Sequence, residues 1–147
     1  MHILPLFFPI LFVVFWLLLI TTISRIGGWH TLAQTFRAPT RGRGKAYKFV
    51  SGCMAGTLPA RYGGCLSLRV QEDGFYLVMW IALFRFQHPP LFIPWSAVQS
   101  VSEEYRFFIY NIDIKLKDHS NIIWIKGRPG KALYHSYVAQ QTLAIAH

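Results

Sequence analysis

The side chains that most often carry chemistry are present in this sequence, but they stand apart from one another. Six histidines occur: His2, His30, His88, His119, His135 and His147. No two of them have the close spacing that would place a metal pair on one helix face or one strand, so we expect no metal site. His88 is the most interesting of them, because it precedes Pro89-Pro90 in a Phe-rich loop. There its imidazole either bonds a turn backbone or contacts a partner or ligand.

Other pairs and motifs also lack the geometry of known catalysts. Glu103 and Glu104 are adjacent in a predicted strand, so their carboxylates point to opposite faces and cannot share a substrate. Neither residues 63–64 nor residues 41–44 have the lysine and hydroxyl spacing of a phosphate-binding loop. We therefore expect a non-enzymatic protein with no catalytic residue, no cofactor and no small-molecule substrate. A hidden enzyme is the remaining alternative.

The two cysteines, Cys53 and Cys65, are too far apart for a zinc motif. We expect both to behave as small buried hydrophobic side chains. The sequence leaves a disulfide between them open, although a reducing cytoplasmic location disfavours it.

The N-terminal segment is apolar and long enough to cross a bilayer. Residues 3–23 contain no charged residue and include sixteen Leu, Ile, Phe or Val, which matches the roughly 20 residues needed for a hydrocarbon core of about 30 Å. On an insertion scale of about −0.3 to −0.6 kcal/mol per such residue, insertion is favoured by roughly 5–10 kcal/mol. We expect residues 1–25 to form a transmembrane anchor. A cleaved signal peptide is disfavoured, because Thr22 to Arg25 offers no small-residue cleavage pattern.

The positive charges that follow the span predict its orientation. Eight Lys or Arg precede the first acidic residue, Glu72, and none precedes the span. The positive-inside rule therefore places the C-terminal part in the cytoplasm and the N-terminus outside, for a single-pass protein of the inner (cytoplasmic) membrane. We expect a membrane-surface set that binds anionic lipid headgroups, namely Arg25, Trp29, Arg37, Arg41, Arg43, Lys45 and Lys48. Lipid accounts for these cations more simply than nucleic acid, which we exclude as a partner.

Residues 26–44 are predicted to connect the anchor to a domain. Gly27-Gly28 permits a sharp turn, and Trp29 is placed at headgroup depth. Trp29, Leu32, Ala33 and Phe36 recur at helical spacing, so a short helix either lies flat on the membrane or packs on a protein partner. Residues 38–45 then form a basic linker.

Residues 45–147 show the periodicity of a mostly β domain. The clearest strand is Ile112 to Lys117, where apolar and charged residues alternate, and Asp73-Gly74 predicts a hairpin. We expect seven strands and then a helix from Pro129 with an apolar stripe. The predicted strands are Tyr47–Cys53, Cys65–Val70, Phe75–Phe84, Leu91–Ile93, Val98–Phe107, Tyr110–Lys117 and Asn121–Lys126. The predicted stripe consists of Leu133, Tyr134, Tyr137, Val138, Ala144 and Ile145.

One stretch resembles a segment at the beginning of a strand in GRAM-like and bacterial pleckstrin-homology-like domains. Its residues are Leu91-Phe92-Ile93-Pro94-Trp95-Ser96-Ala97-Val98-Gln99-Ser100-Val101. Residues 83–90 are similar to a segment of small bacterial membrane-anchored proteins of unassigned function. The resemblance covers roughly residues 45–147. It implies a mainly β fold in which two bent antiparallel sheets form a sandwich or barrel capped by a C-terminal helix, and it implies no particular activity.

The aromatic residues exceed what a domain of this size needs for its own core, so we expect a docking surface. Its predicted residues are Phe86, His88, Pro89, Pro90, Leu91, Phe92 and Trp95. We hypothesise an accessory or scaffolding subunit of a larger membrane complex, such as a photosynthetic or respiratory one, that binds integral membrane protein partners. The alternative is a membrane-anchored module that binds lipid or peptide.

Overall fold

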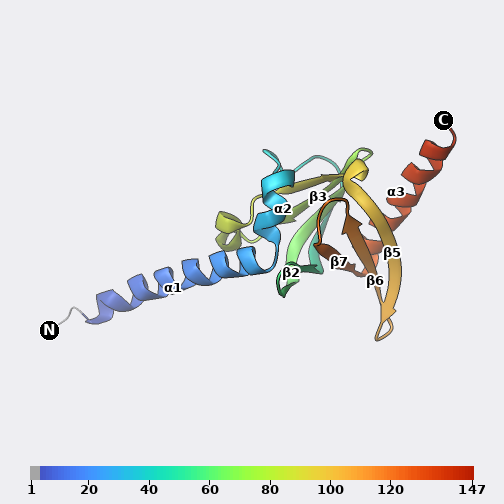
Figure 1. The fold of residues 1–147 in the computed structure, drawn as a ribbon. Helices are drawn as coiled ribbons and strands as arrows, with labels where there is room; N and C mark the ends of the chain where they lie inside the picture. The colour runs from blue at the N-terminus through green and yellow to red at the C-terminus, as the bar shows by residue number, and fades with distance from the viewer. Residues whose placement is uncertain (1–3) are drawn as a thin grey trace.

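The computed structural model describes residues 4–147, so residues 1–3 of the predicted anchor lie outside the described part. It is mainly β, with an apolar helix at one end and a second long helix at the other (Figure 1). The helical elements are α1 (Leu4–Ile26), α2 (Trp29–Phe36), the 3-10 helices η1 (Ala82–Gln87) and η2 (Trp95–Ala97), and α3 (Gly127–Ile145). The strands are β1 (Ala46–Ala55), β2 (Pro59–Val70), β3 (Gly74–Met79), β4 (Leu91–Pro94), β5 (Val98–Arg106), β6 (Ile109–Leu116) and β7 (Ile122–Lys126).

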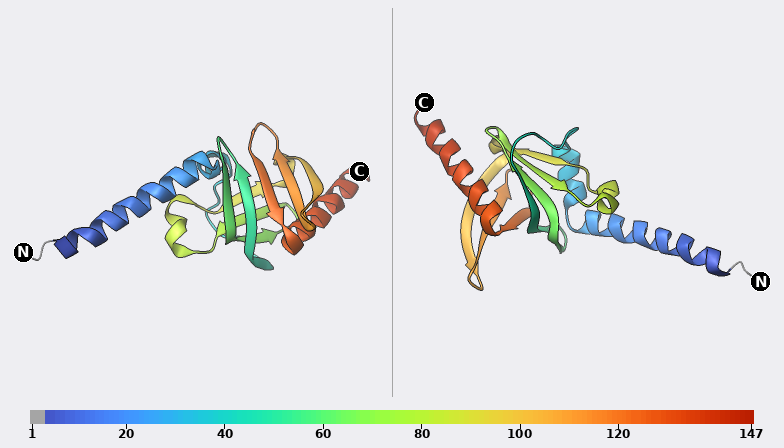
Figure 2. Two further views of the ribbon diagram at one scale, coloured as in Figure 1. Left: turned by 90° about the horizontal axis from the view of Figure 1, so that it is seen from below. Right: turned by 180° about the vertical axis from the view of Figure 1, so that it is seen from behind.

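All seven strands belong to one antiparallel sheet in the order β4-β3-β2-β1-β7-β6-β5. The expected mainly β class is confirmed, but the two separate sheets are not found, because β1 pairs with both β2 and β7 and joins the two halves. The sheet curls into a half-barrel, and α3 lies against β5, β6 and β7 at one side of it (Figure 2). Leu133 of α3 is fully buried in the core, whereas Val138 and Ile145 of the predicted stripe are exposed.

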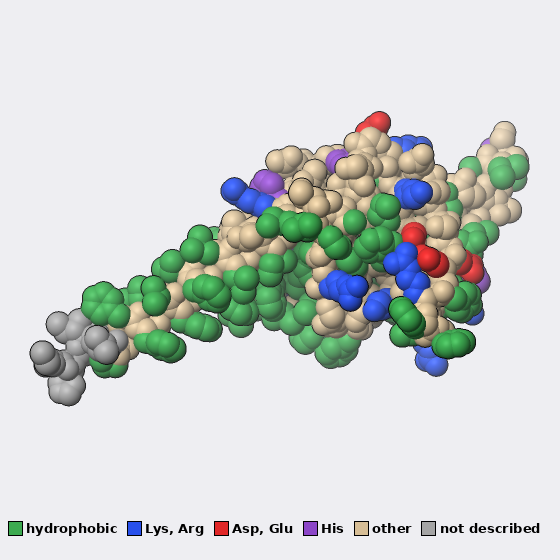
Figure 3. Space-filling model, turned by 60° about the horizontal axis from the view of Figure 1, so that its bottom comes forward, with side chains coloured by type: hydrophobic (Ala, Val, Ile, Leu, Met, Phe, Trp, Pro, Cys, Tyr) green, Lys and Arg blue, Asp and Glu red, His purple; other side chains and the backbone are tan. Residues whose placement is uncertain are grey.

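α1 extends away from the domain as a long helix that is exposed along most of its length (Figures 1 and 3). Its residues Phe7–Ile26 are long and apolar enough to cross a membrane. The hydroxyls of Thr21 and Thr22 each donate a 2.7 Å hydrogen bond to the carbonyl four residues earlier. These polar side chains are thereby satisfied within the helix, as a hydrocarbon environment requires.

The chain after β3 departs from the predicted strand Phe75–Phe84. β3 ends at Met79, whose partner Leu66 is the last residue of β2 that pairs with β3, while β4 pairs only with Gly74 to Leu77. Residues Ala82–Gln87 instead form η1, where the Arg85 guanidinium donates to the carbonyls of Met79 and Trp80 at 3.1 and 2.7 Å. The run of apolar residues therefore contains two different elements.

The apolar stripe of α2 is buried within the chain itself. Trp29, Leu32 and Phe36 belong to the domain core, so this face is covered by the chain's own sheet and is free neither for the membrane nor for a protein partner. The turn between α1 and α2 places Gly28 at φ 86°, in the left-handed region that favours glycine. A Cβ at Gly28 would collide with the Asn121 side-chain amide. This close approach lets α2 dock on the sheet.

Candidate functional site

Three aromatic residues form a buried cluster where the α1–α2 turn meets the sheet. The Trp29 ring contacts the rings of Tyr62 and His88 edge-on, at centroid distances of 5.6 and 5.1 Å. The Trp29 indole N–H donates to the Pro89 carbonyl at 3.0 Å. His88 Nδ1 lies 2.9 Å from the Phe84 carbonyl and Nε2 lies 3.3 Å from the Tyr62 hydroxyl. The cluster thus joins α2, β2 and the loop after η1.

The hydrogen bonds of His88 define its protonation. A carbonyl can only accept, so Nδ1 carries the proton and Nε2 of the neutral ring accepts from the Tyr62 hydroxyl. Burial lowers the pKa of His88. Burial also raises the pKa of Tyr62, which keeps its hydroxyl protonated. Both groups are uncharged, as a buried cluster of this kind requires.

This cluster, together with a hydrogen bond from Ser24 of α1, holds α1 at a fixed position on the domain. The Ser24 hydroxyl donates to the Gln87 carbonyl at 2.7 Å, and Ser24 is buried against the domain. The predicted turn-backbone role of His88 is present in the contact with Phe84. We regard the cluster as a structural clamp, since all three rings are almost fully inaccessible.

The predicted docking surface is divided between core and surface. His88, Leu91 and Trp95 are buried, so they do not form a free surface. β4 is the edge strand of the sheet, and its pairing with β3 turns the side chain of Leu91 into the core. Of this set only Phe86 is exposed, and Pro89, Pro90 and Phe92 are half-buried.

The predicted membrane-surface residues are exposed, with one exception. Trp29 has no exposed surface, so its predicted place among headgroups is wrong. Its ring packs against Tyr62 and His88 instead. The exposed members are Arg25, Arg37, Arg41, Arg43, Lys45 and Lys48. None of them takes part in an ion pair within residues 4–147, where both ion pairs involve Arg106.

The basic linker itself is tied to the sheet. The Arg69 guanidinium donates to the carbonyls of Gly42 and Gly44 at 3.1 and 3.4 Å. The Gln71 amide donates to the Arg43 carbonyl at 2.7 Å. The exposed arginines are therefore presented from a fixed backbone.

A groove of about 470 Å³ lies on the face of the sheet that points away from the core. Its floor includes a cross-strand row, because Cys53 pairs with Arg61 on β2 and with Trp124 on β7. Such directly opposed residues share a face of the sheet. Arg61, Arg106 and Lys126 make the groove basic, and Phe107 forms part of its wall.

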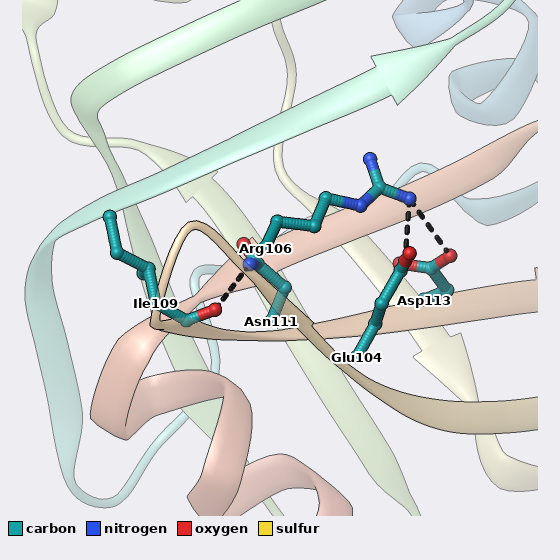
Figure 4. Close-up of polar contacts among 5 residues, drawn as sticks. All are labelled: Glu104, Arg106, Ile109, Asn111 and Asp113. Carbon is teal, nitrogen blue, oxygen red and sulfur yellow. Dashed lines mark hydrogen bonds and ion pairs between the residues drawn. The ribbon is translucent and has the colours of Figure 1, made fainter.

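Arg106 organises the end of this groove. Its guanidinium bonds Glu104 at 2.6 Å and approaches Asp113 at 3.5 Å (Figure 4), and it lies 5.2 Å from the centre of the Trp124 ring. The hydrogen bond from Arg106 lowers the pKa of Glu104, whereas burial raises the pKa of Asp113. Arg106 is thus paired, and Arg61 and Lys126 supply the unpaired positive charge of the groove.

The hairpin tip beside the groove carries two fully exposed phenylalanines. Phe107 and Phe108 are 95% and 103% exposed, at φ 51° and 64°. Arg106 pairs with Ile109, so these two residues form a two-residue hairpin turn with both φ angles positive, a conformation usually held by Asn-Gly. Large side chains in this region are strained, and strain of this kind concentrates at functional sites.

The predicted strands Val98–Phe107 and Tyr110–Lys117 placed a turn within one residue of this tip, but sequence reasoning identified neither the tip nor the groove as a candidate site. The tip has no turn residue to reveal it, and the groove is lined by residues from five strands whose order in the sheet is not visible in the sequence.

Among the described residues no cluster of three metal-ligating side chains occurs. Cys53 and Cys65 are free and half-buried, and burial raises the pKa of the Cys53 thiol, which disfavours a reactive thiolate. The groove is suited to binding an acidic and aromatic segment.

Comparisons with protein-family models, with curated proteins and with solved structures found no match.

Proposed function

We propose that this chain is a non-enzymatic, single-pass membrane protein that serves as an accessory or scaffolding subunit of a larger membrane assembly. Its β domain stands on the cytoplasmic side and holds another integral membrane protein. The observation that carries the proposal is the hairpin tip, where Phe107 and Phe108 occupy strained positions without any packing partner in residues 4–147. A docking role gives a reason for both the strain and the exposure.

The neighbouring groove indicates the chemistry of the partner. Arg61 and Lys126 lie around Trp124 without ion-pair partners among the described residues. Opposite charge steers association and aligns the two surfaces, so the docked segment carries Asp or Glu beside an apolar residue. α1 holds the groove near a bilayer, and a partner embedded in the same bilayer therefore meets it at high effective concentration.

A photo-crosslinking experiment tests this proposal in native membranes. A benzoylphenylalanine replaces Phe108 in the full chain, and a matched chain carries it in place of Ile145, which is 85% exposed on α3. We expect position 108, and not position 145, to crosslink to one membrane protein through an acidic segment. The charge reversals Arg61→Glu and Lys126→Glu should abolish this product.

Two outcomes would contradict the proposal. One is a chain that migrates only as a free monomer after gentle detergent extraction. The other is the same set of weak crosslinks from positions 108 and 145, since chance collisions do not distinguish the two positions.

A lipid-binding module is the second candidate. Its support is the exposed and unpaired set Arg37, Arg41 and Arg43, on a backbone fixed to the sheet. Each such cation near anionic lipid contributes about 1 kcal/mol. In bilayer nanodiscs, Arg41→Glu with Arg43→Glu should then reduce enrichment of anionic lipid around the full chain, while Arg61→Glu should not. Equal enrichment in all three proteins would exclude it.

A further inference from the structure

The 3-10 helix η1 exposes large apolar side chains next to α1. Leu83 and Phe86 are 69% and 71% exposed, although η1 belongs to the domain. Figure 2 shows η1 beside the part of α1 nearest the domain. The Phe84 ring lies 5.4 Å from the Trp16 ring of α1, and Leu83 lines a shallow hollow with Phe12, Trp16 and Leu17. η1 therefore reaches well along the apolar helix.

The depth of these contacts decides what surrounds η1. Trp16 comes nine residues before Arg25, the first cation after the span, and at 1.5 Å per residue this places Trp16 about 13 Å from Arg25 along the helix. Suppose that the bilayer began only beyond η1. The part of α1 before Trp16, Leu4 to Phe15, would then have to cross it, and this part is a helix of only about 18 Å, against a hydrocarbon core of about 30 Å. A crossing by α1 thus requires hydrocarbon at the level of Leu83.

The polar groups of η1 are arranged as such a location demands. Arg85 is half-buried, and its guanidinium turns back to the carbonyls of Met79 and Trp80. The Trp80 indole N–H donates to the Gly64 carbonyl at 2.8 Å, and the Phe49 ring packs edge-on against Trp80 at 4.9 Å. Polar groups near hydrocarbon have to be satisfied internally. The Trp80 indole N–H has its partner, and the Arg85 guanidinium has two backbone partners. Figure 3 shows hydrophobic side chains continuing from α1 onto the adjoining edge of the domain.

We propose that η1 inserts into the leaflet in which α1 ends, with lipid acyl chains covering Leu83 and Phe86. The chain then enters the bilayer twice, once as a full span and once as a wedge of about half a leaflet or more. This inference goes beyond the accessory role, because it depends on α1 and η1 and not on the groove or the hairpin tip.

Depth-dependent fluorescence quenching in reconstituted vesicles tests the insertion. A bimane label is attached to the full chain through Leu83→Cys or Phe86→Cys, in a background of Cys53→Ser and Cys65→Ser. Labels at Val14→Cys in α1 and at Gln99→Cys, which is exposed on β5, serve as the inside and outside references. We expect nitroxides on lipid acyl chains to quench positions 83, 86 and 14 strongly and position 99 weakly. Aqueous iodide should give the reverse order.

Two results would overturn the insertion. Quenching of positions 83 and 86 by iodide to the extent seen at position 99 would place η1 in water. Protection from both quenchers would place it against protein, such as a second copy of this chain. A measurement on the unaltered chain guards against misfolded variants. Diazirine-bearing acyl chains should crosslink to residues 81–87 as well as to α1, and crosslinks confined to α1 would refute the proposal.

Discussion

Replacing the hairpin tip by Asn-Gly separates stability from binding. In Phe107→Asn with Phe108→Gly, the two positive φ angles of 51° and 64° pass to residue types that adopt them readily. A phenylalanine in this region costs roughly 1–2 kcal/mol of stability, a cost that glycine avoids and asparagine reduces. The added glycine offsets about 0.5–1 kcal/mol of this gain, because it loses more conformational entropy on folding. The rings are 95% and 103% exposed, so their loss removes almost no buried area. We expect a net stabilisation of about 1–2 kcal/mol.

Thermal unfolding of the full chain in detergent micelles, followed by circular dichroism, measures this gain. For a chain of this size the gain corresponds to a rise in Tm of about 3–8 °C. The same variant should no longer co-purify with the membrane partner after gentle detergent extraction, as a stabilised functional site commonly loses activity. Phe49→Asn is the matched control, because Phe49 also has a positive φ, 56°, but its ring packs on Trp80. The lost contact should cancel most of the relief of strain.

The reasoning fails on either of two results. A Tm below that of the unaltered chain would mean that the phenylalanine rings pack against something in the isolated protein, or that the turn is unstrained. A stabilised variant that still binds its partner would mean that the tip is not the docking element.

Three further predictions concern the clamp between α1 and the domain. Trp29→Ala should destabilise the chain by about 3–5 kcal/mol in denaturant unfolding, because the ring is fully buried, and Trp29→Phe by less. Because burial lowers the pKa of His88, the unfolded chain takes up a proton first as the pH falls below about 6.5, and stability should decline by at most about 1.4 kcal/mol per pH unit. Unfolding between pH 5 and 7 should show a weaker pH dependence in His88→Asn than in the unaltered chain. Gly28→Ala should lower Tm by a few degrees or more, since the Cβ meets Asn121 at positive φ, whereas Gly44→Ala has the strain without the collision and should cost less.

Local patterns in the sequence predicted those elements whose environment repeats along the chain. The alternation at Ile112 to Lys117 matches β6, where Ile112, Ile114 and Leu116 are buried. The apolar segment matches α1, because hydropathy over some 20 residues is a local property. The helix from Pro129 is found as well, beginning two residues earlier at Gly127.

The predictions that failed concern what covers the apolar face of α2 and most of the expected docking surface. The stripe of α2 is visible in the sequence, but the sequence does not state whether lipid or the chain's own sheet covers Trp29. The apolar run after Phe75 could be divided between β3 and η1 only by knowing where the pairing of β3 with β2 ends. The predicted strands placed a turn near Phe107 and Phe108, but its type was not predicted, because a turn with two positive φ angles is normally recognised by Asn and Gly.

The exposed apolar surfaces of this chain fall into two groups with different geometry, which argues for two different occupants. η1 extends along α1, so its side chains share the surroundings of the helix. The β5–β6 hairpin runs crosswise to α1, and its tip points away from α1 in Figure 1. The hydrogen bonds of Ser24 and Trp29 hold α1 on the domain, so they fix the direction of α1 relative to both η1 and the β5–β6 hairpin. A bilayer that receives η1 therefore leaves Phe107 and Phe108 outside it, where the neighbouring protein that we propose would cover them.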